Sequence, residues 1–551
     1  MFFTPLVSGA GALCRARGKS GRPVGAVRKR PRARRASFER LEVREVLSSV
    51  NPIPGVVVTS IGAATSDWAE ASFLQADGKI VVAGGTIGQN KNHSSYENFA
   101  VLRYGADGVL DPGFGKGGVV TTQFQRLPYP SVAAFSHASS VAPDPSGRIV
   151  AAGGVQFGTD VASNNFALAR YNSNGSLDNT FNYQPPPKKS GSATYGTVQT
   201  DLGGDDGIVG VVFQAGGKIV AVGSSNATGT LRFTLARYTA AGQLDSSFGA
   251  GGIANPSLGR PAYLEDVTTH QGKPLAVGHV IDPGGDDFAL ARYTDNGSLD
   301  TSFGDVDPNN PLLRTGTVIS NRPGDDLAHA VAVYPSGGAY QDCIVVAGEV
   351  QNTFAVARYQ PDGSLDPAFG SGGLVQTLNA FAAYSVAIQP DGKIVAAGLD
   401  GLPSGGYGFF IARYDTSGNV DPSFGAGTGM VTTAIPSLNA SANSVLIQSD
   451  GKIVVTGRGE DGAQRDFIVL ARYNLDGSLD GNFGVSGAGG AIAPSSAALT
   501  DAALADAGRQ QLALAALVQY EDQLQSRPAA RSKGWEVPAI DLALAELALQ
   551  Y

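Results

Sequence analysis

Short apolar runs separated by glycine-containing turns follow one another along most of this chain, and their order repeats. The phrase FALARYNSNGSLDNTF, which begins at Phe166, returns as FAVLRYGADGVLDPGF from residue 99 and as FTLARYTAAGQLDSSF from residue 233. In its first residues, bulky Phe166 and Leu168 alternate with small Ala167 and Ala169, so apolar side chains project from both faces of a strand. A strand with one solvated face would instead carry a polar residue at every second position. The pattern predicts strands that are buried on both sides.

Seven copies of this phrase can be aligned on a shared arginine, with spacings of 67, 67, 55, 66, 55 and 59 residues. Seven repeats of about 60 residues, each rich in strand signals, predict an all-β fold, a seven-bladed β-propeller over residues 55–490. The aligned arginines are Arg103, Arg170, Arg237, Arg292, Arg358, Arg413 and Arg472.

Three further positions keep a fixed distance from each arginine: a glycine follows after five residues, an aspartate after eight and a phenylalanine after eleven. We expect a three-residue hairpin loop that ends on the glycine, because glycine adopts the positive φ of such a turn without strain. Counting back from this turn places Tyr171 opposite Leu177 and Arg170 opposite Asp178.

Arginine and aspartate are therefore expected to pair on one face of every hairpin. A ring of charged ligand sites is one interpretation, and a structural ion pair that fixes the hairpin register is the other. We favour the ion pair, because a buried guanidinium requires such a partner and a single active site would not be repeated in every blade. Removal of Arg237 is then expected to leave Asp245 unpaired. The predicted pairs are Arg103–Asp111, Arg170–Asp178, Arg237–Asp245, Arg292–Asp300, Arg358–Asp366, Arg413–Asp421 and Arg472–Asp480.

An earlier hairpin precedes the phrase in each unit, as in LQADGKIVVAG from residue 74 and IQPDGKIVAAG from residue 388. Asp-Gly between apolar runs is a strong hairpin signal. Two hairpins supply four strands, which is the usual propeller blade. The loop between the two hairpins varies most in length, and variable loops are where binding is expected.

The block from about residue 55 to residue 490 resembles the delta-60 repeat family of exported bacterial proteins, whose unit reads much like VAIQPDGKIVAAG followed by FALARYNxDGSLDxxFG. All seven units carry the second hairpin, whereas HQGKPLAVG from residue 270 lacks the Asp-Gly turn and YPSGGAYQDCIVVAG from residue 334 contains an insertion. The resemblance implies a propeller and export, and it supplies no catalytic residues.

The segment GVVVTS at residue 55 is similar to the GGVVTT segment that follows the first unit, whereas the last unit runs into GVSGAGGAIAPSS, which is poor in strand formers. We therefore expect the strand from Gly55 to Ser60 to pair into the last blade and close the ring. An open sheet edge would invite aggregation.

Composition and charge separate the chain into a basic leader and an acidic body. The first 50 residues carry twelve Lys and Arg against three Asp and Glu, so the remaining residues carry a net charge of −17. Glycine is abundant at 74 residues, which fits strands and turns better than helices. The two cysteines, Cys14 and Cys343, provide neither a disulfide framework nor a cysteine zinc site.

Residues 1–50 are expected to be a disordered export leader. In residues 1–14 the apolar stretch precedes the positive charges, which is the wrong order for an ordinary signal peptide. The basic cluster from Arg28 to Arg35 could contact nucleic acid or anionic lipid, but the acidic body makes nucleic acid the weaker interpretation. The following FERLEVREVLSS resembles the leader of exported planctomycetal surface proteins, whose L-E-x-R-x-x-L-S core matches Leu41 to Ser48. This resemblance implies a secreted or cell-surface location.

The composition changes to Ala and Leu after residue 490, and residues 497–551 predict a helical C-terminal segment of two helices. One interpretation is an oligomerisation or cell-wall docking hairpin. The other, which we favour, is an appendage that packs on the propeller or remains mobile. No run of 18 or more apolar residues follows the leader, so no membrane-spanning helix is expected.

A search for catalytic and binding motifs gives little. GFGKGG at Gly113 matches a nucleotide-binding pattern by its letters, but it precedes a predicted strand instead of a helix. There is no GxSxG, HExxH or Walker motif. The histidines occupy unrelated repeat positions with no metal-ligand spacing, and two tryptophans do not form an aromatic platform. The five histidines are His93, His137, His270, His279 and His329.

Three aspartates recur at one repeat position near the start of a unit: Asp67, Asp206 and Asp326. Carboxylates around one rim could bind Ca²⁺ through oxygen ligands. Aspartate also caps turns by bonding its own backbone, and we favour this structural role.

These observations predict an exported, non-enzymatic propeller, monomeric, that binds or scaffolds a surface protein or polysaccharide without nucleic acid. No cofactor is expected apart from Ca²⁺ at the three aspartates. The alternative is an extracellular lyase or hydrolase acting on glycans at the channel mouth. Convergence of histidines and carboxylates with perturbed pKa values in the channel would favour the enzyme. The spread of the histidines around the ring favours binding.

Overall fold

The computed structural model describes residues 53–62, 65–89, 95–124, 134–157, 164–185, 194–378 and 380–485. The chain divides into two units, and all of these residues belong to the second, Glu45–Tyr551. The predicted leader at 1–50 and helical segment at 497–551 lie outside the described residues. No helix in the described part is long and apolar enough to cross a membrane.

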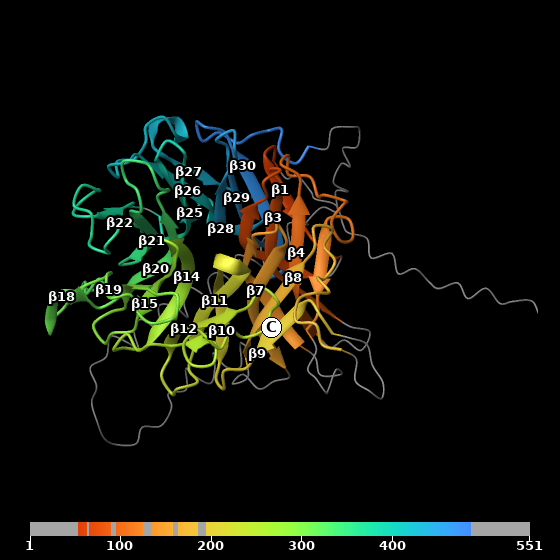
Figure 1. The fold of residues 1–551 in the computed structure, drawn as a ribbon. Coiled ribbons are helices and arrows are strands. Elements are labelled where there is room, and N and C mark those ends of the chain that lie inside the picture. Colours follow the sequence, from red (N-terminus) through yellow and green to blue (C-terminus); the bar gives the residue numbers. More distant parts are fainter. Residues whose placement is uncertain are drawn as a thin grey trace, which may run out of the picture. The chain divides into compact units, whose positions relative to one another are not determined.

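Seven four-stranded antiparallel sheets form a seven-bladed β-propeller, as the repeats predict (Figure 1). The first blade contains β2 (Ser66–Leu74), β3 (Ile80–Gln89), β4 (Ser95–Tyr104) and β5 (Val119–Thr122), paired in that order. Among the described residues there is no α-helix, and two short 3-10 turns, η2 (Ala215–Gly217) and η3 (Gly425–Gly427), interrupt the strands.

The second to sixth blades keep the order of the first. Their strands are β6 (Ala134–Pro143), β7 (Ile149–Phe157), β8 (Asn165–Tyr171) and β9 (Thr197–Thr200); β10 (Asp206–Gln214), β11 (Lys218–Ser225), β12 (Arg232–Tyr238) and β13 (Ile253–Ala254); β14 (Ala262–His270), β15 (Lys273–Val280), β16 (Asp287–Arg292) and β19 (Thr317–Ile319); β20 (Asp326–Val333), β21 (Ile344–Val350), β22 (Thr353–Tyr359) and β23 (Leu374–Gln376); β24 (Ala382–Ile388), β25 (Ile394–Gly401), β26 (Tyr407–Tyr414) and β27 (Met430–Thr433). A small hairpin, β17 (Val306–Asp307) and β18 (Asn310–Arg314), is inserted in the fourth blade.

The last blade closes the ring with the N-terminal strand, as predicted. Its sheet has the order β1 (Val56–Thr59), β30 (Asp466–Tyr473), β29 (Ile453–Glu460) and β28 (Asn439–Ile447). Val56 pairs with Ala471 and Thr59 with Ile468. In Figure 1 the red β1 lies beside the blue β30, although more than 400 residues separate them in the chain.

The fourth strand of each blade does not come from the second hairpin, contrary to our expectation that two hairpins supply four strands. The turn register is as predicted, since Tyr171 bridges Leu177 and the Asp178 amide donates to the Arg170 carbonyl at 2.8 Å. The return arm nevertheless contributes only this bridge, because a tight turn follows, in which the Phe181 amide donates to the Asp178 carbonyl. The segment after the phrase then returns to the sheet and forms the outermost strand, such as β9.

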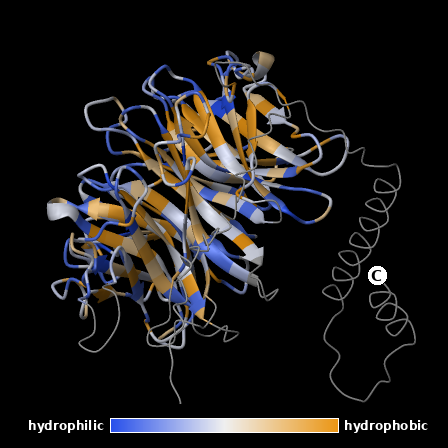
Figure 2. Cartoon of the chain, turned by 90° about the vertical axis from the view of Figure 1, so that its right-hand side faces the viewer, coloured by the Kyte–Doolittle hydropathy of each residue, from blue (hydrophilic) through white to orange (hydrophobic). Residues whose placement is uncertain are grey.

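The core lies between neighbouring blades, which confirms that the strands are buried on both faces. Phe99 of β4 and Ala151 of β7 belong to one buried cluster, and Val57 of β1 and Val82 of β3 belong to another. Hydrophobic residues run along the strands of the stacked blades (Figure 2). Each blade therefore needs a neighbour on both sides.

Candidate functional site

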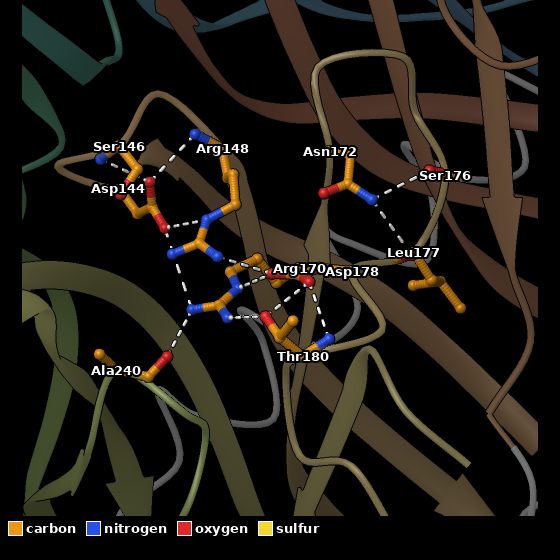
Figure 3. Close-up of polar contacts among 10 residues, drawn as sticks. All are labelled: Asp144, Ser146, Arg148, Arg170, Asn172, Ser176, Leu177, Asp178, Thr180 and Ala240. Atoms are coloured by element: carbon orange, nitrogen blue, oxygen red, sulfur yellow. Dashed lines mark hydrogen bonds and ion pairs between the residues drawn. The ribbon is translucent and has the colours of Figure 1, made fainter. Parts of the chain in front are cut away.

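The repeated arginine joins two blades. Arg170 Nε lies 2.8 Å from Asp178 Oδ2, and its Nη1 donates to the Ala240 carbonyl of the next blade at 2.5 Å (Figure 3). All seven predicted pairs are present, with Nε–Oδ2 distances of 2.7 to 2.9 Å. In every blade the arginine also reaches a backbone carbonyl of the next blade, and Arg472 closes the ring by donating to Ala106 at 2.6 Å.

The repeated phenylalanine and glycine belong to the same contact between neighbouring blades. The phenylalanine lies beneath the guanidinium, 4.3 to 4.7 Å from ring centroid to Cζ in all seven blades. The glycines have φ between 83° and 93°, and a Cβ on Gly242 would lie 2.7 Å from Phe181 of the preceding blade. These contacts support the structural interpretation of the repeated charges over a ring of ligand sites.

A second cation, which we did not predict from the sequence, pairs with most of the repeated aspartates. Lys218 Nζ lies 2.8 Å from Asp245 Oδ2, so removal of Arg237 would not leave Asp245 unpaired, contrary to our expectation. Burial opposes ionisation of Asp300, but hydrogen bonds from Lys273 and Ser302 and the charge of Arg292 lower its pKa to about 2. These cations follow the first-hairpin turn, as in the repeated DGK letters, which was the available signal.

The fifth blade lacks this second cation. Cys343, which is buried, occupies the position just before β21 that Lys79 occupies before β3. Arg358 is consequently the only ion-pair partner of Asp366 among the described residues.

The three candidate calcium ligands lie in separate blades, each at or near the start of an innermost strand. Asp67 Oδ2 accepts hydrogen bonds from Ser60, Ile61 and Thr65. Asp206 accepts from the Leu202 amide and the Ser225 hydroxyl. The described residues contain no group of three or more His, Cys, Asp or Glu placed to hold a metal ion. These contacts support a capping role for Asp67 and Asp206, and Ca²⁺ binding stays a prediction.

A central cavity of about 670 Å³ is lined by residues from all seven blades. Each innermost strand contains one β-bulge, whose extra residue has no partner on the adjacent strand. Bulges redirect side chains and are typical of functional positions. The seven extra residues all line the cavity, and they are Glu70, Ser139, Val209, Glu265, His329, Tyr384 and Asn443.

The channel carboxylates have raised pKa values. Desolvation raises the pKa of Glu70 and of Glu265, and the charge of His329 partly offsets it at Glu265. Burial raises the pKa of Asp266 to about 7, although its carboxylate accepts hydrogen bonds from the amides of Val267 and Val331.

Two histidines share this channel, which corrects the expectation that the histidines are spread around the ring. His137 and His329 come from the second and fifth blades. Desolvation disfavours the charged imidazole of His137, but a 2.8 Å hydrogen bond to Glu97 and the charges of Glu97 and Glu70 raise its pKa. The spacing of the histidines alone did not show this, because a propeller brings the innermost strands of distant units to one axis.

The two other described histidines, His270 and His279, do not line the channel. His270 is buried against Arg292, with 3.0 Å between Nδ1 and Nη1. His279 is buried near Tyr263. His93 lies outside the described residues, as do parts of the variable loops where we expected binding, residues 90–94 and 158–163.

A glycine that recurs in every unit marks the bulges. A Cβ on Gly84, Gly153 or Gly278 would lie 1.9 to 2.0 Å from a backbone oxygen of the innermost strand, just before the bulge residue. A glycine inside a strand pattern is a known signal of a bulge. The last glycine of KIVVAG could therefore have located the channel residues from the sequence.

The seven repeats match the sequence model of a β-propeller family, the domain of unknown function DUF5122. The matched segments are residues 75–114, 145–181, 214–248, 273–303, 344–369, 389–424 and 448–483. No curated protein matches the chain.

Two solved structures illustrate the structural similarity. The NanB sialidase from Streptococcus pneumoniae, in complex with 2-[(3-chlorobenzyl)ammonio]ethanesulfonate, is 10% identical with a TM-score of 0.35, covering 74% of this chain and 68% of that chain. Sqt1 from Chaetomium thermophilum is 11% identical with a TM-score of 0.37, covering 75% of this chain and 98% of that chain.

Proposed function

We propose that this propeller is a non-enzymatic binding module whose ligand enters the central channel. The observation that carries this proposal is the contrast between two kinds of repeat position. The residues that join the blades are the same in all seven units, whereas the bulge residues differ in every blade except for two glutamates. A scaffold that presents different side chains around one axis is suited to recognising one asymmetric ligand.

The channel chemistry favours an oligosaccharide as that ligand. Carboxylates, an amide, hydroxyls and a guanidinium line the cavity, including Glu70, Asn443 and Arg458. Such groups donate to and accept from sugar hydroxyls, and Tyr384 adds an aromatic ring beside His329, with 5.3 Å between the ring centroids. The cavity volume lies in the range of ligand sites, ~300–1,000 Å³.

Export to the cell surface is part of this proposal. Its support is the basic leader and the L-E-x-R-x-x-L-S core at Leu41 to Ser48. A surface location would expose the channel to extracellular polysaccharide or to a glycosylated surface protein.

Calorimetric titration of the full chain with soluble oligosaccharides of cellulose, xylan, mannan, chitin and chitosan tests the proposal. We expect at least one to bind, with affinity reduced at least tenfold by Tyr384→Ala or Glu265→Gln. Tyr183→Ala provides a matched control, because Tyr183 is 53% exposed and does not line the channel. Equal affinity in the parent and both channel variants would refute a channel site.

Glycan cleavage is a second candidate, because histidines converge in the channel with carboxylates whose pKa values are raised, and such convergence favours an enzyme. Glu70, Glu265 and His329 line one channel, and the raised pKa values of the two glutamates suit a general acid. Chromatography of the same mixtures after long incubation distinguishes the two functions. Binding predicts intact oligosaccharides, and cleavage predicts shorter products that Glu265→Gln abolishes.

A further inference from the structure

The fifth blade departs from the repeat at a buried carboxylate. Asp326 occupies the position of Asp67 and Asp206 and is 1% exposed. Neither of its carboxylate oxygens has a hydrogen-bond partner of ordinary geometry among the described residues. A buried polar group without a partner is costly and calls for an explanation.

One substitution accounts for the missing hydroxyl partner. Thr86 and Ser225 lie directly opposite Asp67 and Asp206 on the adjacent strands, whereas Val350 lies opposite Asp326 and has no hydroxyl.

The backbone donor is also diverted. The Leu202 amide donates to Asp206, but the equivalent amide, that of Arg322, donates to Asp287 Oδ1 at 2.8 Å. The Ser320 hydroxyl also donates to Asp287, at 3.2 Å. The carboxylate of Asp326 is thus left without the donors that serve its counterparts.

A second repeated contact is missing at the same place. In five blades the tyrosine that follows the repeated arginine bonds a hydroxyl on the outer strand of the preceding blade, as Tyr238 does with Thr200 at 2.7 Å and Tyr104 with Thr59 at 3.0 Å. The buried Tyr293 hydroxyl of the fourth blade lacks this contact among the described residues. Ser320 occupies this outer-strand position before Tyr359, yet no hydrogen bond joins the two. The Tyr359 hydroxyl therefore has no partner among the described residues.

These unpaired groups line one cavity of about 240 Å³ between the fourth and fifth blades. Asp305, Ser320, Asp326 and Tyr359 contribute polar atoms, and Phe288 and Leu374 contribute apolar walls. The Asp305 carboxylate already accepts a hydrogen bond from the Ile319 amide at 3.2 Å. Arg322 lines the same cavity, and its guanidinium has no ion pair or hydrogen bond within the part of the chain that the structure describes. One cavity therefore presents an unpaired carboxylate and an unpaired guanidinium beside apolar surface.

We propose that this cavity binds a small zwitterion of the α-amino acid type. The ligand's ammonium group is held by Asp326 with the hydroxyl of Tyr359, and its carboxylate is held by Arg322. The apolar walls accommodate a short side chain. This site is separate from the central channel, so it stands independently of the proposed function.

Other ligand classes fit the lining less well. A metal ion would require a group of carboxylate or histidine ligands, and none is present among the described residues. A simple anion would face the buried Asp326, and a simple amine would face the cationic Arg322 without a carboxylate to neutralise it. A zwitterion satisfies the buried Asp326 and the half-buried Arg322 at once, and a buried charge requires an opposite charge beside it.

Calorimetric titration of the full chain at pH 8 with each of the twenty free L-amino acids tests the site. Propylamine and propionate serve as probes that carry one charge each. We expect at least one small apolar amino acid to bind at least tenfold more tightly than either probe. Asp326→Asn and Arg322→Gln should each reduce its affinity at least tenfold. Asp206→Asn, at the equivalent position in the third blade, should leave the affinity unchanged within twofold.

A variant that keeps both charged residues separates loss of binding from loss of folding. Val350→Thr introduces a hydroxyl like the one that Ser225 donates to Asp206, and it should reduce affinity at least fivefold while the circular dichroism spectrum is unchanged. The proposal is overturned if no amino acid binds, if propylamine binds as tightly as the amino acid, or if binding survives Asp326→Asn.

Discussion

At the residue scale, the repeated letters encode contacts between blades more than contacts within them. Each arginine pairs with an aspartate of its own blade, stacks on a phenylalanine and reaches a carbonyl of the next blade, as Arg170 does. The pairing of arginine with aspartate followed from the hairpin register. The carbonyl contact did not, because it depends on which blade lies alongside. The second ion pair of the aspartate, with a lysine, was not predicted, because that lysine lies in the first hairpin of the unit and the aspartate lies in the second.

The second cation makes the seven arginine–aspartate pairs unequal in their contribution to stability. Arg358→Ala leaves the buried Asp366 without an ion-pair partner, so we expect a loss of about 3–4 kcal/mol in unfolding free energy. Arg237→Ala should cost about 1 kcal/mol less, because Lys218 still pairs with Asp245. Urea denaturation of both variants measures the difference. Identical losses would show that the lysine contributes nothing.

The buried Asp326 predicts a pH dependence of stability. Desolvation, with smaller contributions from the charges of Asp287 and Asp325, raises its pKa to about 6, and Arg322 and Ser320 oppose the rise. Between pH 4 and pH 6 the folded protein then holds more protons than the unfolded chain, so this residue makes stability fall as the pH rises.

Asp326→Asn removes this titration. We expect its stability relative to the parent to improve by about 2 kcal/mol between pH 4 and pH 8. Urea denaturation at both pH values provides the measurement, and taking the difference from the parent cancels the other titrating groups. A difference that does not change with pH contradicts the prediction.

At the element scale, the bulges decide where the variable residues lie. The first hairpin of each unit was predictable from its Asp-Gly turn, but the bulge inside its first strand was not recognised, and so the channel residues were missed. The outermost strand was also misassigned, because the return arm of the phrase turns away after one bridge. The turn residues therefore predicted the hairpins correctly, whereas the apolar runs did not show which segment forms the outermost strand.

Adjacent glycines of β7 allow a matched test of the bulge. A Cβ on Gly153 would lie 2.0 Å from the His137 carbonyl oxygen, whereas a Cβ on Gly154 would meet nothing within 4 Å. Gly153→Ala should therefore destabilise the protein by about 3 kcal/mol, and Gly154→Ala should have little effect. Thermal denaturation of the two variants compares them directly. Similar melting temperatures would contradict the tight approach of the two strands.

At the scale of the whole molecule, the number of blades and the closure of the ring were predictable. The number of blades follows from counting the repeats. The closure follows because the last unit lacks an outer strand and the segment from Gly55 to Ser60 resembles one. The ligand sites were not predicted, although the repeated glycine could have located the channel residues. The channel ring joins residues from seven units, and the cavity near Asp326 exists because one blade departs from the others.

Ring closure can be tested by removing its strand. A chain that begins at Asp67 lacks β1 and the Thr59 hydroxyl that bonds Tyr104. We expect it to melt at a lower temperature than the parent and to aggregate more readily, because the outer edge of β30 is exposed. An unchanged melting temperature in the truncated chain would show that β1 does not close the ring.

We propose that the bulge residues of the channel, and not the repeated charges, bind the ligand. The most direct measurement is a crystal structure of the protein grown with the oligosaccharide that gives the strongest calorimetric signal. We expect electron density for the sugar in the channel, in contact with Glu265, His329 and Tyr384. Sugar density at the repeated Arg–Asp pairs, with an empty channel, would contradict this proposal.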